Sequence, residues 1–523
     1  MTCARRGAVL LGLLAGLTLL RLVVAAVAPL APDEAYYWVF SHALAPGYLD
    51  HPPMVAVWIR AGTAIAGQGA LGVRLLGPLA GALGTLLLFD AAERLWGSGP
   101  GRQPEEVRTD THPPPGLAPL RGPSPQREGR HSSHPGLTAA ALLNATLMAG
   151  VGAVIMTPDT PLLFFWTACL WALVRLLESR RPAWWLAIGL FAGLALASKY
   201  TAVLLWIGIG LWLLWVPSQR HWWRSPVLWA GAVLGALVFL PVVLWNAEHG
   251  WASFLRQGGR VDAWQPARAV QFLGELAGGQ VGLATPLVFV LFVVGVGRAA
   301  RLGWRLRDPA WSLLAALTLP GAALFAQHAL GDRVQGNWPA ILYPAAALAA
   351  AGLDGPRWLR LRWPAVGLGL AITLLVYVQA TSFALPIPAR IDPIARQLAG
   401  WDGLARSVDA ARRGQGAAFV GSDEYGVAAE LARALPDDTP MLGVAPRWRL
   451  FRLPPADLRD AAGLLVRRDG SRAPVGWREA HLAGEVARTG QGVVVQRLSL
   501  WRVEGALPSL PAVVLPRYAP AGR

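Results

Sequence analysis

The chain contains 523 residues, of which 54% are hydrophobic and only 15% are charged, and its mean hydropathy is +0.41. Soluble globular proteins carry about 25% charged residues, so this composition excludes an ordinary soluble protein and predicts a polytopic membrane protein. The net charge of +16 is typical of arginines that flank apolar segments, and no basic stripe with stacking aromatics indicates nucleic-acid binding.

In chain order, about eleven apolar segments are predicted to span the membrane. They are 8–30, 71–95, 137–156, 160–177, 183–198, 201–216, 227–245, 280–297, 309–328, 338–353 and 364–384. The first follows the basic pair Arg5-Arg6 and is predicted to be an uncleaved signal anchor. Several segments are shorter than the roughly 20 residues that a straight helix needs to cross a bilayer. Two short neighbours could therefore form one re-entrant pair.

The arginines between these segments predict the orientation of the chain. With the N-terminus in the cytoplasm, each short inner loop carries at least two arginines, as the positive-inside rule expects. Residues 97–136 are rich in Pro, Gly, Arg and Ser and are predicted to form a disordered cytoplasmic loop. The last span then runs outward and places 385–523 outside.

The predicted fold class is an all-α polytopic membrane bundle at 1–384, followed by an extracytoplasmic α/β domain at 385–523. In the second region, residues 417–434 indicate a strand, a turn at Gly421-Ser422-Asp423 and a helix. Residues 492–498 indicate a further strand. These patterns favour a small mixed α/β domain.

The first outer loop contains two polar motifs. Asp33-Glu34 follows Pro32 and precedes Tyr36-Tyr37-Trp38. One Asp would suffice to cap a helix, so the adjacent Glu and the aromatic cluster favour a functional site over a simple cap. The second motif, Asp50-His51-Pro52-Pro53, could equally be a turn into the amphipathic stretch 54–66, which is predicted to be an interfacial helix.

Further polar residues lie in the later outer turns. Asp159 could cap the following span, because Pro161 falls in its first turn. Lys199 is the single lysine of the chain and stands between Ser198 and Tyr200. Its retention is explained equally well by a need for a compact ammonium group at this position and by chance. The remaining outer candidates are Arg256, Arg333 and Asn337.

If the spans form a bundle, all these outer turns share one rim. Carboxylates and cations would then line one cavity, in which cations stabilise a phosphate leaving group and a carboxylate accepts a proton from an attacking hydroxyl. The chain has neither a P-loop nor a Rossmann fingerprint. The activated donor is therefore expected to arrive on a lipid.

These motifs resemble those of the GT-C membrane glycosyltransferases, in the branch of the protein O-mannosyltransferases and the lipid A aminoarabinose transferase. The matching pieces lie between residues 5 and 385 and include 32–38, 50–53, 157–161, 198–200, 245–251 and 336–339. The resemblance implies a polyprenyl-phosphate sugar donor, inverting transfer at the periplasmic face, Asp33 as the catalytic carboxylate and Asp159 as the second-loop acid. His51 stands where some relatives have Lys, so the group that holds the donor phosphate stays open between Lys199 and Arg333.

The resulting hypothesis is a multi-pass glycosyltransferase of the bacterial inner membrane, acting in lipopolysaccharide or other glycan biosynthesis on lipid A, another glycan or a protein. The expected catalytic residues are Asp33, Glu34 and Asp159. The expected donor-binding residues are Asp50, His51, Lys199, Tyr200, Arg256, Arg333 and Asn337. The chemistry requires no metal cofactor, although a carboxylate cluster could hold a divalent ion. The alternatives are a transporter or flippase of a polyprenyl-linked glycan and a non-catalytic assembly partner.

Overall fold

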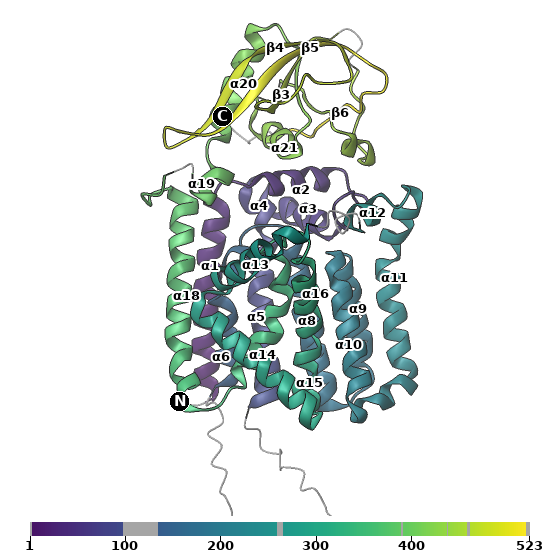
Figure 1. Cartoon of the computed structure of the whole chain (residues 1–523), viewed down its shortest axis with the longest axis vertical. Helices are drawn as coiled ribbons and strands as arrows, with labels where there is room; N and C mark the ends of the chain where they lie inside the picture. Colours follow the sequence, from purple (N-terminus) through teal and green to yellow (C-terminus); the bar gives the residue numbers. More distant parts are fainter. Residues whose placement is uncertain are drawn as a thin grey trace, which may run out of the picture.

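The computed structural model describes residues 3–97, 134–258, 265–388, 391–436, 438–457 and 461–518. Most of the loop expected at 97–136 therefore lies outside the described residues. Within them, a bundle of helices carries a sheet-containing domain at one end (Figure 1). We call this the sheet end of the bundle and the opposite end the basic end.

The helices of the bundle differ widely in length. Their bounds are α1 (Cys3–Val27), α2 (Pro32–His42), α3 (Met54–Ala66), α4 (Ala70–Arg74), α5 (Leu76–Trp96), α6 (Pro135–Asn144), α7 (Leu147–Gly152), α8 (Asp159–Ser179), α9 (Trp184–Leu196), α10 (Val203–Trp215), α11 (Pro226–Glu248), α12 (Ala252–Gly258), α13 (Ala269–Ala284), α14 (Pro286–Leu306), α15 (Pro309–Ala316), α16 (Leu319–His328), α17 (Tyr343–Ala351) and α18 (Pro356–Ser382). Proline opens α11, α14 and α18, where its missing N–H costs no hydrogen bond.

The described residues form a multi-pass helical bundle, but with fewer full-length spans than the eleven that we expected. Six helices are long and apolar enough to cross a membrane, or up to eight if each of two bent helix pairs is one span. The difference lies in the shorter segments. For example, 183–198 contains only the 13-residue α9, and 137–156 is divided into α6 and α7.

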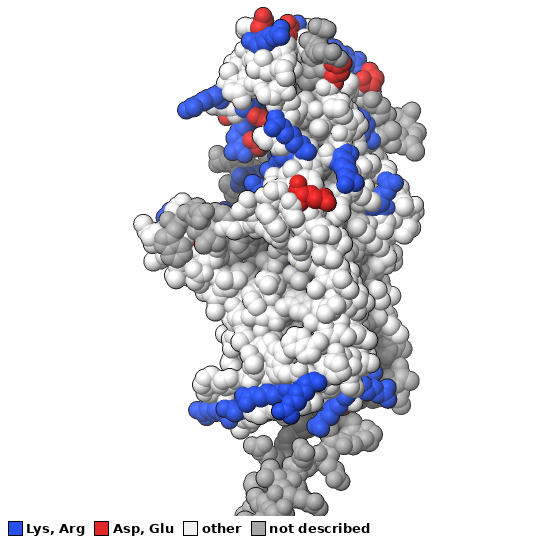
Figure 2. All heavy atoms as spheres, turned by 90° about the vertical axis from the view of Figure 1, so that its right-hand side faces the viewer, with Lys and Arg blue, Asp and Glu red and all other residues white. Residues whose placement is uncertain are grey.

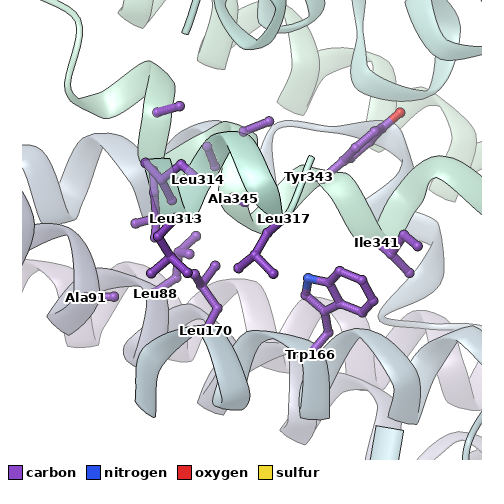
Figure 3. Close-up of a cluster of buried hydrophobic side chains, with 14 of the residues drawn as sticks. Leu88, Ala91, Trp166, Leu170, Leu313, Leu314, Leu317, Ile341, Tyr343 and Ala345 are labelled. Carbon is purple, nitrogen blue, oxygen red and sulfur yellow. The ribbon is translucent and has the colours of Figure 1, made fainter. Parts of the chain in front are cut away.

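The centre of the bundle is packed with apolar side chains from α5, α8, α15 and α17. Leu88, Trp166, Leu170 and Leu313 are fully buried there (Figure 3). Close packing of this kind makes the bundle rigid. The helix ends at the sheet end are therefore held in fixed positions relative to one another.

Three shorter helices lie across the sheet end, beneath the domain (Figure 1). The chain bends by 86° between α1 and α2, so α2 turns away from the bundle axis. The stretch expected to be an interfacial helix at 54–66 is α3, with α4 next to it in sequence. These helices separate the spans from the sheet domain.

The domain contains one six-stranded mixed sheet with the strand order β4-β5-β3-β1-β2-β6. The elements are α19 (Pro393–Leu398), α20 (Trp401–Gly414), β1 (Phe419–Ser422), α21 (Tyr425–Ala434), β2 (Met441–Gly443), the 3-10 helix η6 (Pro446–Leu450), β3 (Gly463–Arg468), β4 (Trp477–Gly490), β5 (Val493–Ala506) and β6 (Val513–Val514). β1 is parallel to β2 and β3, with Val420 opposite Met441 and Leu464. The strand, turn and helix expected at 417–434 are β1 and α21.

Charged side chains are distributed unevenly along the molecule. Figure 2 shows a band of arginines at the basic end, a wide uncharged middle and mixed charges over the sheet domain. An uncharged belt between two charged ends is the surface expected of a protein whose middle lies in lipid.

Candidate active site

The site begins at the first turn of α2, where Asp33 and Glu34 take different directions. Glu34 is fully buried, and its carboxylate accepts hydrogen bonds from Nε and Nη2 of Arg74 at 2.7 and 2.5 Å. It also accepts hydrogen bonds from the backbone N–H groups of Ala31 and Met156. This buried ion pair fastens α2 to α4 and to the chain before α8. The expectation that Glu34 is catalytic is therefore not supported by its position, because Glu34 does not line the cavity described next.

A cavity of about 250 Å³ lies between the helix ends and the sheet domain. We call it the carboxylate cavity. Of the expected site residues, it brings together Asp33, Asp50, His51, Asp159, Lys199, Arg256 and Asn337. They come from α2, the α2–α3 connection, the start of α8, the turn before α10, α12 and the turn before α17. The polar lining also includes Tyr36, Tyr37, Thr157, Gln335, Tyr425 and Arg447.

Asp159 is held by two partners in the carboxylate cavity. The Lys199 Nζ atom donates to its two oxygens at 2.7 and 2.9 Å, and the Asn337 amide donates to Oδ2 at 2.6 Å. Both side chains of the ion pair are more than nine-tenths buried. The single lysine of the chain therefore joins α8 to the α9–α10 turn at the cavity wall.

Asp50 is held by two arginines. Arg256 Nε donates to Oδ1 at 2.7 Å, and Arg447 Nη1 donates to Oδ2 at 3.0 Å. The Tyr36 hydroxyl donates to the same carboxylate at 2.9 Å. Burial alone would raise the pKa of Asp50, but Arg447 and Arg256 hold that pKa below its ordinary value. Asp50 therefore stays ionised and orients both guanidinium groups.

Asp33 differs from the other carboxylates of the cavity. Its Oδ1 accepts a hydrogen bond from the Tyr425 hydroxyl at 3.0 Å, and no Lys or Arg of the described chain forms an ion pair with it. The Asp33 side chain is accessible from the cavity, but the surrounding protein replaces part of its contact with water. This partial burial raises the pKa of Asp33, and the negative charges of Asp50 and Glu34 raise it further. A carboxylate with a raised pKa and no counter-cation is suited to accept a proton.

A second cavity, of about 310 Å³, adjoins the first. We call it the side cavity. The two cavities share His51, Lys199 and Trp338, and Tyr200 lines only the side cavity. Its remaining wall is largely apolar, from α10 and α16, and ends at Val203 and Leu324, which are exposed on the bundle surface. The side cavity therefore connects the polar site with the lipid-facing surface.

Arg333 is not brought into the site. Its side chain is 70% exposed and pairs with Glu275 at 2.9 Å. Arg333 lines neither cavity, whereas Lys199 lines both. Of the two cations expected to hold a donor phosphate, the geometry therefore favours Lys199.

Three site residues were missed by the sequence analysis, namely Arg74, Tyr425 and Arg447. Arg74 falls inside the predicted span 71–95 and was not singled out. The other two come from the sheet domain, about 400 residues after Asp33, and no periodicity or motif links them to α2. Within the described residues, no group of three or more His, Cys, Asp or Glu side chains is arranged to hold a metal ion.

Comparison with known proteins extends these observations. Residues 130–245 match the family model described as dolichyl-phosphate-mannose-protein mannosyltransferase. The lipid A galacturonosyltransferase RgtD of Rhizobium johnstonii is 27% identical over 442 residues, which cover 82% of this chain and 81% of that protein.

Solved structures share the fold over nearly the whole chain. The crystal structure of ArnT from Cupriavidus metallidurans bound to undecaprenyl phosphate aligns with a TM-score of 0.59 at 11% identity, covering 96% of this chain and 98% of that one. The same protein in the apo state aligns with a TM-score of 0.56 at 13% identity, covering 95% and 98%. The arrangement of helical bundle and sheet domain is therefore an ArnT-like fold.

Proposed function

We propose that this chain, which belongs to the GT-C membrane glycosyltransferases and uses a lipid-phosphate-linked sugar as donor, transfers galacturonic acid from a polyprenyl phosphate to lipid A. The similarity to the lipid A galacturonosyltransferase RgtD supports this choice of sugar and acceptor. We place the reaction at the outer face of the bacterial inner membrane, with 385–523 as the outer domain and 1–384 as the membrane domain.

The observation that carries the proposal is that the three aspartates of the carboxylate cavity have different partners. Asp50 and Asp159 are neutralised by cations, whereas Asp33 has only the Tyr425 hydroxyl. Asp33 is therefore the carboxylate that accepts the proton of the acceptor hydroxyl. The acceptor oxygen attacks the anomeric carbon, the bond from that carbon to the phosphate oxygen breaks, and the configuration inverts. The polyprenyl phosphate leaves with the bonding electron pair, and the proton on Asp33 later returns to water.

The two cavities supply an orientation for the donor. Lys199 and His51 line both cavities, so a phosphate placed there faces the reacting sugar in the carboxylate cavity and the polyprenyl chain in the side cavity. Cations at this position stabilise the charge that develops on the departing phosphate. Val203 and Leu324 then mark the route by which the chain enters the bilayer.

The test uses purified protein in proteoliposomes with labelled galacturonyl polyprenyl phosphate and lipid A. Wild-type protein should form labelled lipid A, and Asp33→Asn should lower the rate by about 10²- to 10⁴-fold, the usual contribution of general-base catalysis. Glu275→Gln is the matched control, because Glu275 pairs with an exposed arginine outside both cavities. Full turnover by Asp33→Asn would reject the assignment. Donor that crosses the bilayer unchanged, without product, would favour the transporter instead.

A further inference from the structure

Arg447 is a residue of the sheet domain that reaches the carboxylate cavity. It lies on η6, directly after β2, and its side chain is 16% exposed. Its Nη1 atom donates to Asp50 at 3.0 Å and to the Tyr36 hydroxyl at 3.2 Å. Its guanidinium carbon lies 4.3 Å from the centre of the Tyr425 ring. The ion pair and the aromatic contact fix the direction of the guanidinium group.

Arg447 retains hydrogen-bonding capacity toward the cavity. A guanidinium group has five N–H donors, and in the described chain the hydrogen bonds of Arg447 all involve Nη1. Asp50 meanwhile holds Arg256 as well, so one negative charge is shared by two positive ones. Two guanidinium groups thus flank Asp50, and the N–H donors of Arg447 that Asp50 and Tyr36 do not engage suit an anion.

Arg447 and Lys199 have different neighbours in the carboxylate cavity. Lys199 lies at the wall shared with the side cavity, where the apolar chain of the donor begins. Arg447 instead contacts Tyr425, whose hydroxyl bonds to Asp33. A sugar whose anomeric carbon lies between Lys199 and Asp33 then has Arg447 as a second cationic group at the cavity wall. A hexuronic acid carries a carboxylate on C5, where a neutral hexose carries a hydroxymethyl group.

Building on the proposed function, we infer that Arg447 is a specificity-determining residue that binds the carboxylate of a uronic acid on the donor. The fork of N–H donors matches a planar carboxylate with two parallel hydrogen bonds. A neutral sugar would leave these donors without a charged partner. The sheet domain would in this way select the sugar, while the membrane bundle holds the phosphate.

The experiment compares three ligands on purified protein in nanodiscs: polyprenyl phosphate, its galacturonyl ester and its galactosyl ester. The dissociation constants are measured by direct binding and competition with labelled polyprenyl phosphate. Arg447→Gln should weaken binding of the galacturonyl ester by about 10- to 100-fold, the range for a hydrogen bond to a charged group. The dissociation constants of the other two ligands should change by less than about 3-fold, because neither ligand carries a carboxylate for Arg447 to bind. Arg447→Lys, which keeps the charge but loses the fork, should fall between the two.

Arg449→Gln is the matched control, because Arg449 lies on the same short helix but donates to the Ser509 carbonyl. Melting temperatures show whether each variant is folded. Equal weakening of all three ligands would assign Arg447 to the phosphate and overturn the inference, as would unchanged binding of all three by a folded Arg447→Gln. If wild-type protein binds no polyprenyl phosphate ligand at all, the proposed function itself fails.

Discussion

Asp33 and Glu34 are neighbours in the chain but have opposite environments. Glu34 forms a buried ion pair with Arg74 and accepts hydrogen bonds from two backbone N–H groups, so its side chain is fixed in position. Removing one partner of such a pair costs about 3–5 kcal/mol, because the other charge stays buried without compensation. Glu34 therefore contributes to the position of α2, whereas in the proposed mechanism Asp33 contributes the reactive oxygen.

The hydrogen bond from Tyr425 to Asp33 predicts a pH effect. Burial raises the pKa of Asp33, and the Tyr425 hydroxyl lowers it by stabilising the ionised form. A base is active only when deprotonated, so the rate should fall as the pH drops through this pKa. Tyr425→Phe removes the lowering contribution, and we expect the acidic limb of the kcat/KM profile to shift to higher pH.

The profile is measured for wild type and Tyr425→Phe over the same pH range, with melting temperatures as the folding control. A shift toward lower pH, or an unchanged limb with an unchanged plateau, would mean that Tyr425 does not act on the base. A purely structural role for Tyr425 would lower the plateau without moving the limb.

Individual site residues differed in how well the sequence predicted them. Asp50, Asp159 and Lys199 each had a structural explanation on their own, and they became candidates because the outer turns were expected to share one rim. Glu34 was proposed because a carboxylate pair at the end of an apolar segment is costly without a role, but its carboxylate forms a buried ion pair with Arg74 instead of lining the cavity. Arg447 could not be identified, since its position depends on how a separate domain docks, and no local pattern encodes that contact.

At the level of elements, the contact between α2 and α21 sets the geometry of the site. Gly426 in the first turn of α21 faces Pro32, the first residue of α2, so closely that a Cβ atom would lie 2.9 Å from the Pro32 Cβ. The proline ring cannot rotate away. This close approach is what allows the neighbouring Tyr425 to reach Asp33.

Gly426→Ala should therefore separate the two helices. Overpacking of this kind costs about 1–3 kcal/mol, and we expect a lower melting temperature together with a several-fold lower transfer rate. Gly403→Ala on α20 is the matched control, because no atom lies within 4 Å of its added Cβ and alanine favours a helix. If the two variants have the same melting temperature and transfer rate, the close approach of α2 and α21 does not set the geometry of the site.

Element types were easier to predict than element lengths. The strand and helix at 417–434 follow from a short apolar run, a Gly-Ser-Asp turn and a helical pattern, which are all local features. The short helices α6, α7, α9 and α17 were read as full spans, because an apolar sequence looks the same whether it crosses a membrane or packs within a bundle. Their breaks are tolerated where neighbouring helices surround the chain.

At the level of the whole molecule, the charge pattern and the fold give one consistent picture. The basic end carries arginine-rich loops, and the sheet end carries the domain and both cavities (Figures 1 and 2). Arginine-rich short loops stay in the cytoplasm. We therefore expect the site to open to the outer side, where a lipid-linked donor can supply an activated sugar and soluble nucleotides are scarce.

This orientation can be tested with single cysteines. Cys169 is buried and can stay, and Cys3 is replaced by serine. Val475→Cys is placed in an 88% exposed position of the sheet domain, and Arg181→Cys in the exposed turn after α8 at the basic end. A membrane-impermeant maleimide added to intact spheroplasts should label Val475→Cys, and it should label Arg181→Cys only after the membrane is opened. The reverse pattern would place the carboxylate cavity in the cytoplasm, where nucleotide sugars are available, and would remove the reason for a lipid-linked donor.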